Sequence, residues 1–193
     1  MLLLAVVLLQ ATPLDPLVAK LDRIGFLEAD FVQEDYWALT REEELSTGHL
    51  LLASPDLFLF EYEDPEGRAA GFDGAVLYTI EPSSGQVLLS EGGGSSFLAF
   101  LDLGSDSQLI SSSSIAGDTV EVVLEGDLGE GIVMMEVAFS SSDSLPLSLV
   151  SVDANDNRTA WVLSSVEVSR TAPEGCFDLV VPEGFEVVRP GDL

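Results

Sequence analysis

The chain has 193 residues, of which 34 are Asp or Glu and 7 are Lys or Arg, so its formal net charge is −27 at pH 7. This length suits one domain, and a hydrophobic content of 47% excludes a disordered acidic tail. The pI of about 4.1 argues against nucleic-acid binding and against docking on anionic lipid headgroups, since both need clustered cations. One Cys excludes an internal disulfide, and one His with one Lys leaves little material for catalysis. The composition favours a binding protein over an enzyme.

The chain begins with an apolar run from Leu2 to Leu9, which is too short to span a bilayer. Its length is typical of the apolar region of a secretory signal peptide, although no Lys or Arg precedes it. We therefore expect a signal peptide at 1–13 and one domain at 14–193, soluble and not inserted in a membrane. The alternative is a buried N-terminal strand or helix.

Residues Leu14 to Phe31 form a pattern typical of an amphipathic helix, with Pro16 in its first turn. The chain then changes to a period of two, which predicts strands around 48–62, 76–80 and 84–92. Further strands are predicted at 119–125, 131–139, 147–153, 159–170 and 176–181, separated by turn signals. Polar runs at 111–114 and 140–142 are predicted to be loops. Short strands joined by tight turns indicate a mostly antiparallel sheet.

A triple glycine at 92–94 precedes Phe97, Leu98, Phe100 and Leu101, which repeat at helical spacing. An apolar short helix tethered by glycines in a β-rich chain is typical of a movable cover. An ordinary helix packed permanently on the core fits the periodicity equally well.

The order of motifs resembles the LolA family of periplasmic outer-membrane lipoprotein carriers. The motifs that carry this resemblance are "FVQED" (31–35), "GHLLLASPDLFLFEY" (48–62), "FDGAVLYTIEP" (72–82), "VDANDNRTAWVLSSVEV" (152–168) and "CFDLVVPEGFEVV" (176–188). The resemblance implies a strongly bent antiparallel half-barrel, covered by an N-terminal helix and a short lid helix, that encloses an apolar cavity for acyl chains. Family members commonly carry an Arg before the strand proline to hold the lid shut, whereas this chain has Ser54 before Pro55.

The residues expected to form this site follow from the helix stripe and from the alternating strand positions. The lid would contribute Phe97, Phe100 and Leu101. The expected cavity lining is Leu17, Leu21, Ile24, Leu50, Leu52, Phe58, Phe60, Tyr62, Val76, Tyr78, Val120, Val122 and Leu124. Without the resemblance, alternating aromatics on strands would favour an ordinary packed core.

The resemblance implies a monomeric periplasmic chaperone without a cofactor, which carries acylated lipoproteins from the inner to the outer membrane. Its expected partners are an ATP-driven lipoprotein-releasing complex of the inner membrane and a lipoprotein acceptor of the outer membrane. One alternative is a carrier or sensor of other lipids or glycolipids on the same fold. Another is an envelope hydrolase that uses acidic residues.

Catalytic and metal signals are weak. A nucleophile needs a nearby base, and His49 lies within an apolar strand, where a structural role is favoured. Cys176 is expected to be a small hydrophobic residue, since nothing nearby would lower its pKa. The segment 153–157 imitates the start of a calcium loop, but Arg158 and Ser164 occupy the expected Gly and Glu positions. A hairpin turn is the better interpretation.

The acidic surplus is expected on the convex face and in loops. Because Lys is nearly absent, we expect a salt-adapted protein whose self-repulsion is screened. The run from Arg41 to Glu44 is predicted to be a solvated loop, or else a surface that meets a basic partner.

Overall fold

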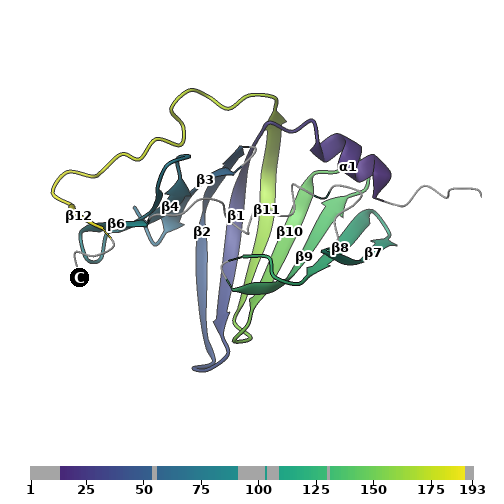
Figure 1. The fold of residues 1–193 in the computed structure, drawn as a ribbon, viewed down its shortest axis with the longest axis horizontal. Helices are drawn as coiled ribbons and strands as arrows, with labels where there is room; N and C mark the ends of the chain where they lie inside the picture. Colours follow the sequence, from purple (N-terminus) through teal and green to yellow (C-terminus); the bar gives the residue numbers. More distant parts are fainter. Residues whose placement is uncertain (1–13, 54–55, 91–102, 104–108, 130, 190–193) are drawn as a thin grey trace, which may run out of the picture.

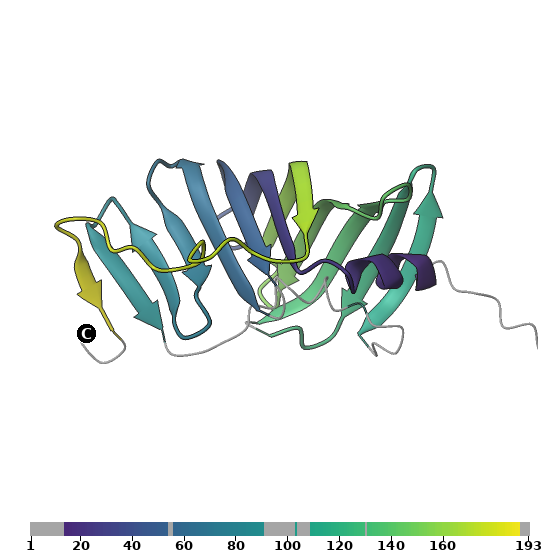
Figure 2. The same ribbon diagram turned by 90° about the horizontal axis from the view of Figure 1, so that it is seen from above.

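The computed structural model describes residues 14–53, 56–90, 103, 109–129 and 131–189. In this part of the chain one short helix accompanies a single open, curved sheet of twelve strands (Figures 1 and 2). The elements are α1 (Asp15–Leu21), β1 (Phe26–Trp37), β2 (Glu42–Ala53), β3 (Leu57–Asp64), β4 (Ala69–Phe72), β5 (Leu77–Glu81), β6 (Gln86–Ser90), β7 (Ile110–Ala116), β8 (Thr119–Glu125), β9 (Ile132–Ser140), β10 (Pro146–Asp153), β11 (Arg158–Ser169) and β12 (Glu186–Val188).

The sheet is built from two antiparallel meanders that meet at its centre. Its strand order is β12-β6-β5-β4-β3-β2-β1-β11-β10-β9-β8-β7, so β1 pairs with β2 on one side and with β11 on the other. After β11, residues 171–185 run back across the sheet, and β12 then pairs parallel with β6 at the far edge (Figure 1). We call residues 171–185 the strap. A mainly antiparallel sheet, as the short strands and tight turns predicted, is confirmed.

The helix is shorter than the pattern predicted. α1 ends at Leu21, and β1 begins at Phe26, so the predicted continuation to Phe31 is wrong. The helical stripe in fact stops at Ile24, and the following Leu27, Ala29 and Phe31 alternate with a period of two. Gly25 separates the two elements because its backbone packs directly on Arg170, where a Cβ would lie 2.0 Å from the carbonyl oxygen.

Three further predictions fail for identifiable reasons. The serine run 111–114 lies in β7, where an edge strand with one partner tolerates exposed polar side chains. The acidic residues 42–44 begin β2, as an extension of the long β1–β2 hairpin beyond the apolar core. Residues 176–181 form no strand but lie in the strap, between Pro173 and Pro182, where Gly175 adopts a positive φ of 74°. The short strand β4 was not predicted.

The strands predicted at 119–125, 131–139, 147–153 and 159–170 are confirmed to within one or two residues. The hairpin turn predicted at 153–157 is also confirmed. There the Asp153 carboxylate accepts hydrogen bonds from the backbone N–H groups of Asn155 (2.7 Å) and Asn157 (2.9 Å), and from the Asn157 side chain. These bonds lower the pKa of Asp153, with the Asn157 side chain as the largest cause. Within the described ranges, no helix has the length and apolar character needed to cross a membrane.

Both faces of the sheet bury apolar side chains, because alternate strand residues point to opposite sides. α1 lies over the β8–β10 part of one face, which we call the helix face (Figures 1 and 2). The strap packs on the other, which we call the strap face, where Phe177 contacts Phe26 with ring centroids 6.3 Å apart. The strand β2 illustrates the alternation, since Leu50 and Leu52 lie on the helix face and Leu51 and Ala53 on the strap face.

Candidate functional site

The helix face carries a continuous apolar cluster that extends from α1 across both meanders. Most of the residues expected to line the cavity lie in it. Ile24 and Tyr62 are half-buried and packed against the cluster. Nine others are buried within it: Leu17, Leu21, Leu50, Leu52, Phe58, Phe60, Val120, Val122 and Leu124. The structure thus brings together positions that lie more than 100 residues apart in the sequence.

Two of the expected residues lie elsewhere. Tyr78 is buried on the strap face, where its hydroxyl donates to the carbonyl oxygen of Phe177 at 3.4 Å. Val76 is half-buried in the turn before β5 and joins neither cluster. Tyr78 therefore does not share a face with Phe60, and burial raises its pKa to about 12.

The lid residues Phe97, Phe100 and Leu101 lie outside the described residues, and so does Ser54. Leu103, which follows that segment, is described and is 2% exposed within the helix-face cluster.

Sequence reasoning missed much of the central part of the cluster. The first half of β1 was predicted to be helical, which hid Leu27, Ala29 and Phe31, all of them buried on the helix face. The alternation of apolar residues in β9–β11 is visible in the sequence. It would have added Met135, Val137, Phe139, Leu149, Trp161 and Leu163.

Aromatic rings from three strands meet at the centre of the helix face. The Phe60 ring centroid lies 5.5 Å from that of Phe31, 6.0 Å from Phe58 and 6.4 Å from Trp161. Tyr62 completes the group, 5.4 Å from Phe31 and edge-on to it. Such rings offer a large apolar surface, and edge-to-face pairs each add about 1 kcal/mol beyond the area they bury.

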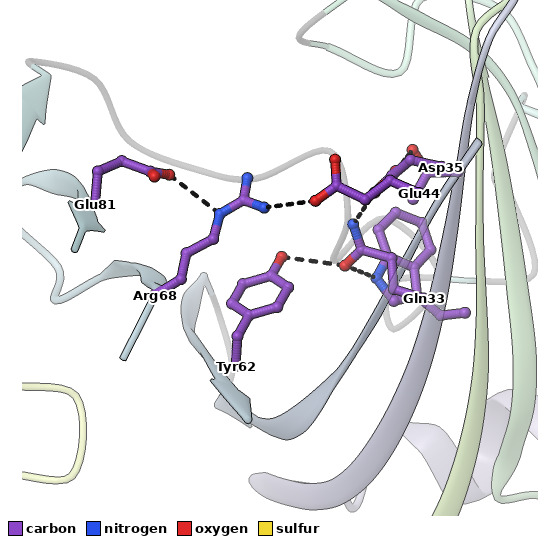
Figure 3. A network of polar contacts seen from close by, with 8 residues as sticks. Gln33, Asp35, Glu44, Tyr62, Arg68 and Glu81 are labelled. Atoms are coloured by element: carbon purple, nitrogen blue, oxygen red, sulfur yellow. Dashed lines mark hydrogen bonds and ion pairs between the residues drawn. The ribbon is translucent and has the colours of Figure 1, made fainter. Parts of the chain in front are cut away.

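A polar network borders this aromatic group, toward the β1–β2 hairpin (Figure 3). The side-chain oxygen of Gln33, a buried residue, accepts from the Tyr62 hydroxyl (3.1 Å) and from the Trp161 indole (3.0 Å). Its amide nitrogen donates to Asp35 at 2.7 Å, and Asp35 also accepts from the Thr159 hydroxyl at 2.7 Å. The network fixes the orientation of the two amphipathic rings at the edge of the apolar cluster.

Arg68, which directly precedes β4, lies at the same edge of the aromatic group. Its guanidinium lies 5.0 Å from the centre of the Tyr62 ring and pairs with Glu81 at 3.1 Å and with Glu44 at 3.9 Å. The aromatic contact and the two ion pairs connect β2, β3 and β5 (Figure 3). Burial raises the pKa of Tyr62, and the positive charge of Arg68 opposes that rise.

His49 and Cys176, the residues considered for catalysis, lie in surroundings typical of structural residues. His49 lies on β2 with its Nδ1 atom 3.1 Å from Asp30 and its Nε2 atom 3.9 Å from Glu28. Hydrogen bonds from Ser165 and then from His49 lower the pKa of Asp30. Burial raises the pKa of Cys176, which disfavours the reactive thiolate.

Comparisons with known proteins cover most of the chain. The model of the family "Outer membrane lipoprotein carrier protein LolA" matches residues 23–180. An uncharacterized conserved protein from Thermus thermophilus has a similar structure, with a TM-score of 0.57 and 12% identity over 93% of this chain and 100% of that one. No curated protein sequence matches the chain.

Two further solved structures are similar at lower scores. A LolA superfamily protein from Nitrosomonas europaea has a TM-score of 0.42 and 12% identity, over 86% of this chain and 98% of that one. A DUF1329 family protein from Desulfovibrio piger has a TM-score of 0.46 and 11% identity, over 84% and 95%. Because the family model matches most of the length of this chain, the chain belongs to the LolA family of outer membrane lipoprotein carrier proteins.

Proposed function

We propose that this protein is a periplasmic carrier that shields the acyl chains of lipoproteins against its helix face and takes them from the inner to the outer membrane. The observation that carries the proposal is the apolar cluster on one face of an open curved sheet, centred on Phe60. Burial of each acyl CH₂ group recovers about 0.8 kcal/mol, so a long aliphatic chain is bound by apolar area alone. Membership of the family supports the same conclusion.

The proposal also assigns roles to the first residues, to the lid segment and to the partners of the protein. Residues 1–13 act as a signal peptide and 14–193 form a single lipid-binding domain of half-barrel shape. Phe97, Phe100 and Leu101 belong to a lid that moves aside when an acyl chain enters. An ATP-driven complex in the inner membrane loads the monomer, an outer-membrane acceptor unloads it, and no step is enzymatic.

A pair of charge substitutions on β3 tests whether the helix face binds lipid. Phe60 (6% exposed) lies on the helix face, and its neighbour Leu59 (8% exposed) lies on the strap face. A ligand-binding face must open to water, so Phe60→Glu is expected to cost less stability there than a charge in a permanently packed layer. We expect Phe60→Glu to weaken binding of a fluorescent fatty acid more than tenfold while the chain stays folded.

Leu59→Glu is the matched control, and we expect it to lower the melting temperature more than Phe60→Glu does. Binding of the fluorescent fatty acid is followed by titration, and folding by circular dichroism. Unfolding of Phe60→Glu to the same extent as Leu59→Glu would identify the helix face as ordinary core. Unchanged fatty-acid affinity in a folded Phe60→Glu protein would also contradict the proposal.

A further inference from the structure

Three of the seven cationic residues of this strongly acidic chain gather around one pocket. Lys20, Arg23 and Arg170 line a hollow of about 280 Å³. It lies where the end of α1, the turn between β9 and β10 and the end of β11 meet. Asp143 is the one carboxylate among its lining residues, so three positive charges face one negative charge. The pocket is thus locally cationic in a protein whose net charge is −27.

The backbone holds these cations together. The N–H of Gly25 donates to the carbonyl oxygen of Ser169 at 3.0 Å, which fixes the end of α1 against the end of β11. A Cβ on Gly25 would lie 2.0 Å from the carbonyl oxygen of Arg170, so the two backbones are in direct contact. This contact sets Arg23 and Arg170 on the same pocket.

The cationic side chains have capacity for a ligand. Among the ion pairs of the described residues, none involves Arg23 or Arg170, whereas Arg68 and Arg158 pair with glutamates. Lys20 donates one hydrogen bond, to the carbonyl oxygen of Ser142 at 3.1 Å. An ammonium group has three donors, and a guanidinium group has five arranged as a fork that suits phosphate oxygens.

The carboxylates of the β1–β2 hairpin lie at the other end of the strands, whereas Glu28 and Glu167 line a neighbouring hollow that shares Val168 and Ser169 with this pocket. Glu43 pairs with Tyr36 across β2 and β1, and Tyr36 pairs with Arg158, at the start of β11. The pocket lies at the opposite end of that 12-residue strand, and residues in a strand advance by about 3.3 Å each. Since the Debye length at physiological salt is about 8 Å, the hairpin carboxylates act weakly on an anion in the pocket.

The other walls of the pocket are apolar. Ile24, Leu145 and Val168 line it beside the cations, and Val168 is 44% exposed. A small inorganic anion would make no use of these walls, whereas the carbon atoms next to a lipid phosphate would.

We propose that this pocket binds the phosphate group of an anionic amphiphile, with Arg23, Arg170 and Lys20 on the phosphate and Ile24 and Val168 against the adjoining carbons. The site lies apart from the aromatic rings around Phe60, although it shares Ile24, which packs on the helix-face cluster, with the expected lining of the carrier cavity. The proposal does not require acyl-chain binding at Phe60. Phosphate is the chemistry that the cations recognise, and either a lipid headgroup or free phosphate supplies it. The apolar walls favour the lipid.

The test is a titration of the whole isotope-labelled protein followed by amide NMR shifts, with inorganic phosphate and dihexanoyl phosphatidic acid below its micelle concentration as probes. We expect the lipid to shift the amides of Ile24 and Ser169 at a concentration about tenfold below that of phosphate. Arg23→Gln/Arg170→Gln is expected to weaken this binding about tenfold through the loss of charge-assisted hydrogen bonds. Arg41→Gln, at the far hairpin, is the control and should leave it unchanged.

Four outcomes would contradict the proposal, in part or as a whole. Equal affinity for phosphate and for the lipid would overturn the assignment to a lipid. Shifts confined to Phe60 and its neighbours would overturn the pocket site and leave the carrier proposal standing. Equal weakening by Arg41→Gln and by the double variant would reduce the effect to net charge and overturn the site as well. Absence of pocket shifts with both probes would also overturn it.

Discussion

At the scale of single residues, Gln33 connects three other side chains at the border of the helix face. Its carbonyl oxygen satisfies Tyr62 and Trp161, and its amide satisfies Asp35. We predict that Gln33→Leu lowers the free energy of unfolding by about 3 kcal/mol, because a part-buried hydroxyl, indole and carboxylate lose a partner together. Chemical denaturation measures this loss.

Tyr62→Phe is the control for Gln33→Leu. It removes one donor and leaves the Trp161 bond to Gln33 in place, so its expected cost is about 1 kcal/mol. Equal costs for the two variants would show that Gln33 does not organise the network.

The residue scale is also where the sequence was most informative about the site. Phe58, Phe60 and Tyr62 alternate in the sequence and do share the helix face. The polar network was not foreseeable, because Gln33, Tyr62 and Trp161 come from strands whose pairing the sequence does not display.

At the scale of elements, the position of Tyr78 shows why the register between strands limits sequence-based prediction. Cross-strand partners share a face, and β4 pairs with β5 through Gly71↔Tyr78 and Phe72↔Leu77. Phe72 lies on the helix face, so Tyr78 lies on the strap face. The number of residues in the turn between β4 and β5 decides which face Tyr78 occupies, and a turn one residue longer or shorter would place Tyr78 on the opposite face.

The strap gives a pH-dependent prediction at this scale. Burial raises the pKa of Tyr78 from 10 to about 12, so the folded state favours the neutral phenol. The corresponding stability is fully present below pH 10 and is lost as the pH rises through about 12. Phenolate absorbance during an alkaline titration should show a component near pH 12 that is missing in Tyr78→Phe. Persistence of that component in the variant would assign it to another tyrosine.

The close approach of β2 and β3 gives a second prediction for an element. A Cβ on Gly48 would lie 2.1 Å from the carbonyl oxygen of Glu61 and 2.9 Å from the Phe31 ring. Gly48→Ala must therefore separate the two strands, and we predict a loss of about 3 kcal/mol in the free energy of unfolding.

Gly117→Ala is the comparison for Gly48→Ala. Its added Cβ would meet no atom within 4 Å, and its cost, from a φ of 62°, is expected to be about 1 kcal/mol. Thermal or urea unfolding of both variants checks the order. Equal losses would show that the strand contact at Gly48 is not tight.

At the scale of the whole molecule, the unbalanced charge is the dominant feature. The net charge is −27 because 7 Lys and Arg residues face 34 Asp and Glu residues. In the described residues, the ion pairs of Arg68 and Arg158 are half-exposed. Such pairs contribute about 0–1 kcal/mol each, so they do not offset the self-repulsion.

We therefore predict that salt stabilises the fold. The melting temperature in 2 M KCl should exceed that at low salt by at least about 5 °C, since the Debye length falls to a few ångströms. Calorimetry across a KCl series measures it, with sucrose as a control for solute exclusion. Full stability after dialysis into low salt would contradict salt adaptation.

The sequence predicted the kind of architecture but not its full extent. Alternation located most strands of the second meander, because each of those strands has a clear turn on either side. β1 was missed because an amphipathic helical stripe runs directly into it, and β7 because an edge strand needs few apolar residues. The strap was misread because its apolar residues pack without forming a ladder, which local periodicity does not reveal.

The central claim is that the helix face binds acyl chains carried by a protein. Native mass spectrometry of the purified protein with an acylated lipoprotein and with its unacylated twin tests this claim most directly. The account predicts a complex with the acylated form alone, lost in Phe60→Glu. Equal binding of both forms, or binding of neither, would contradict it, and selective retention of a phospholipid or glycolipid would replace the lipoprotein as cargo.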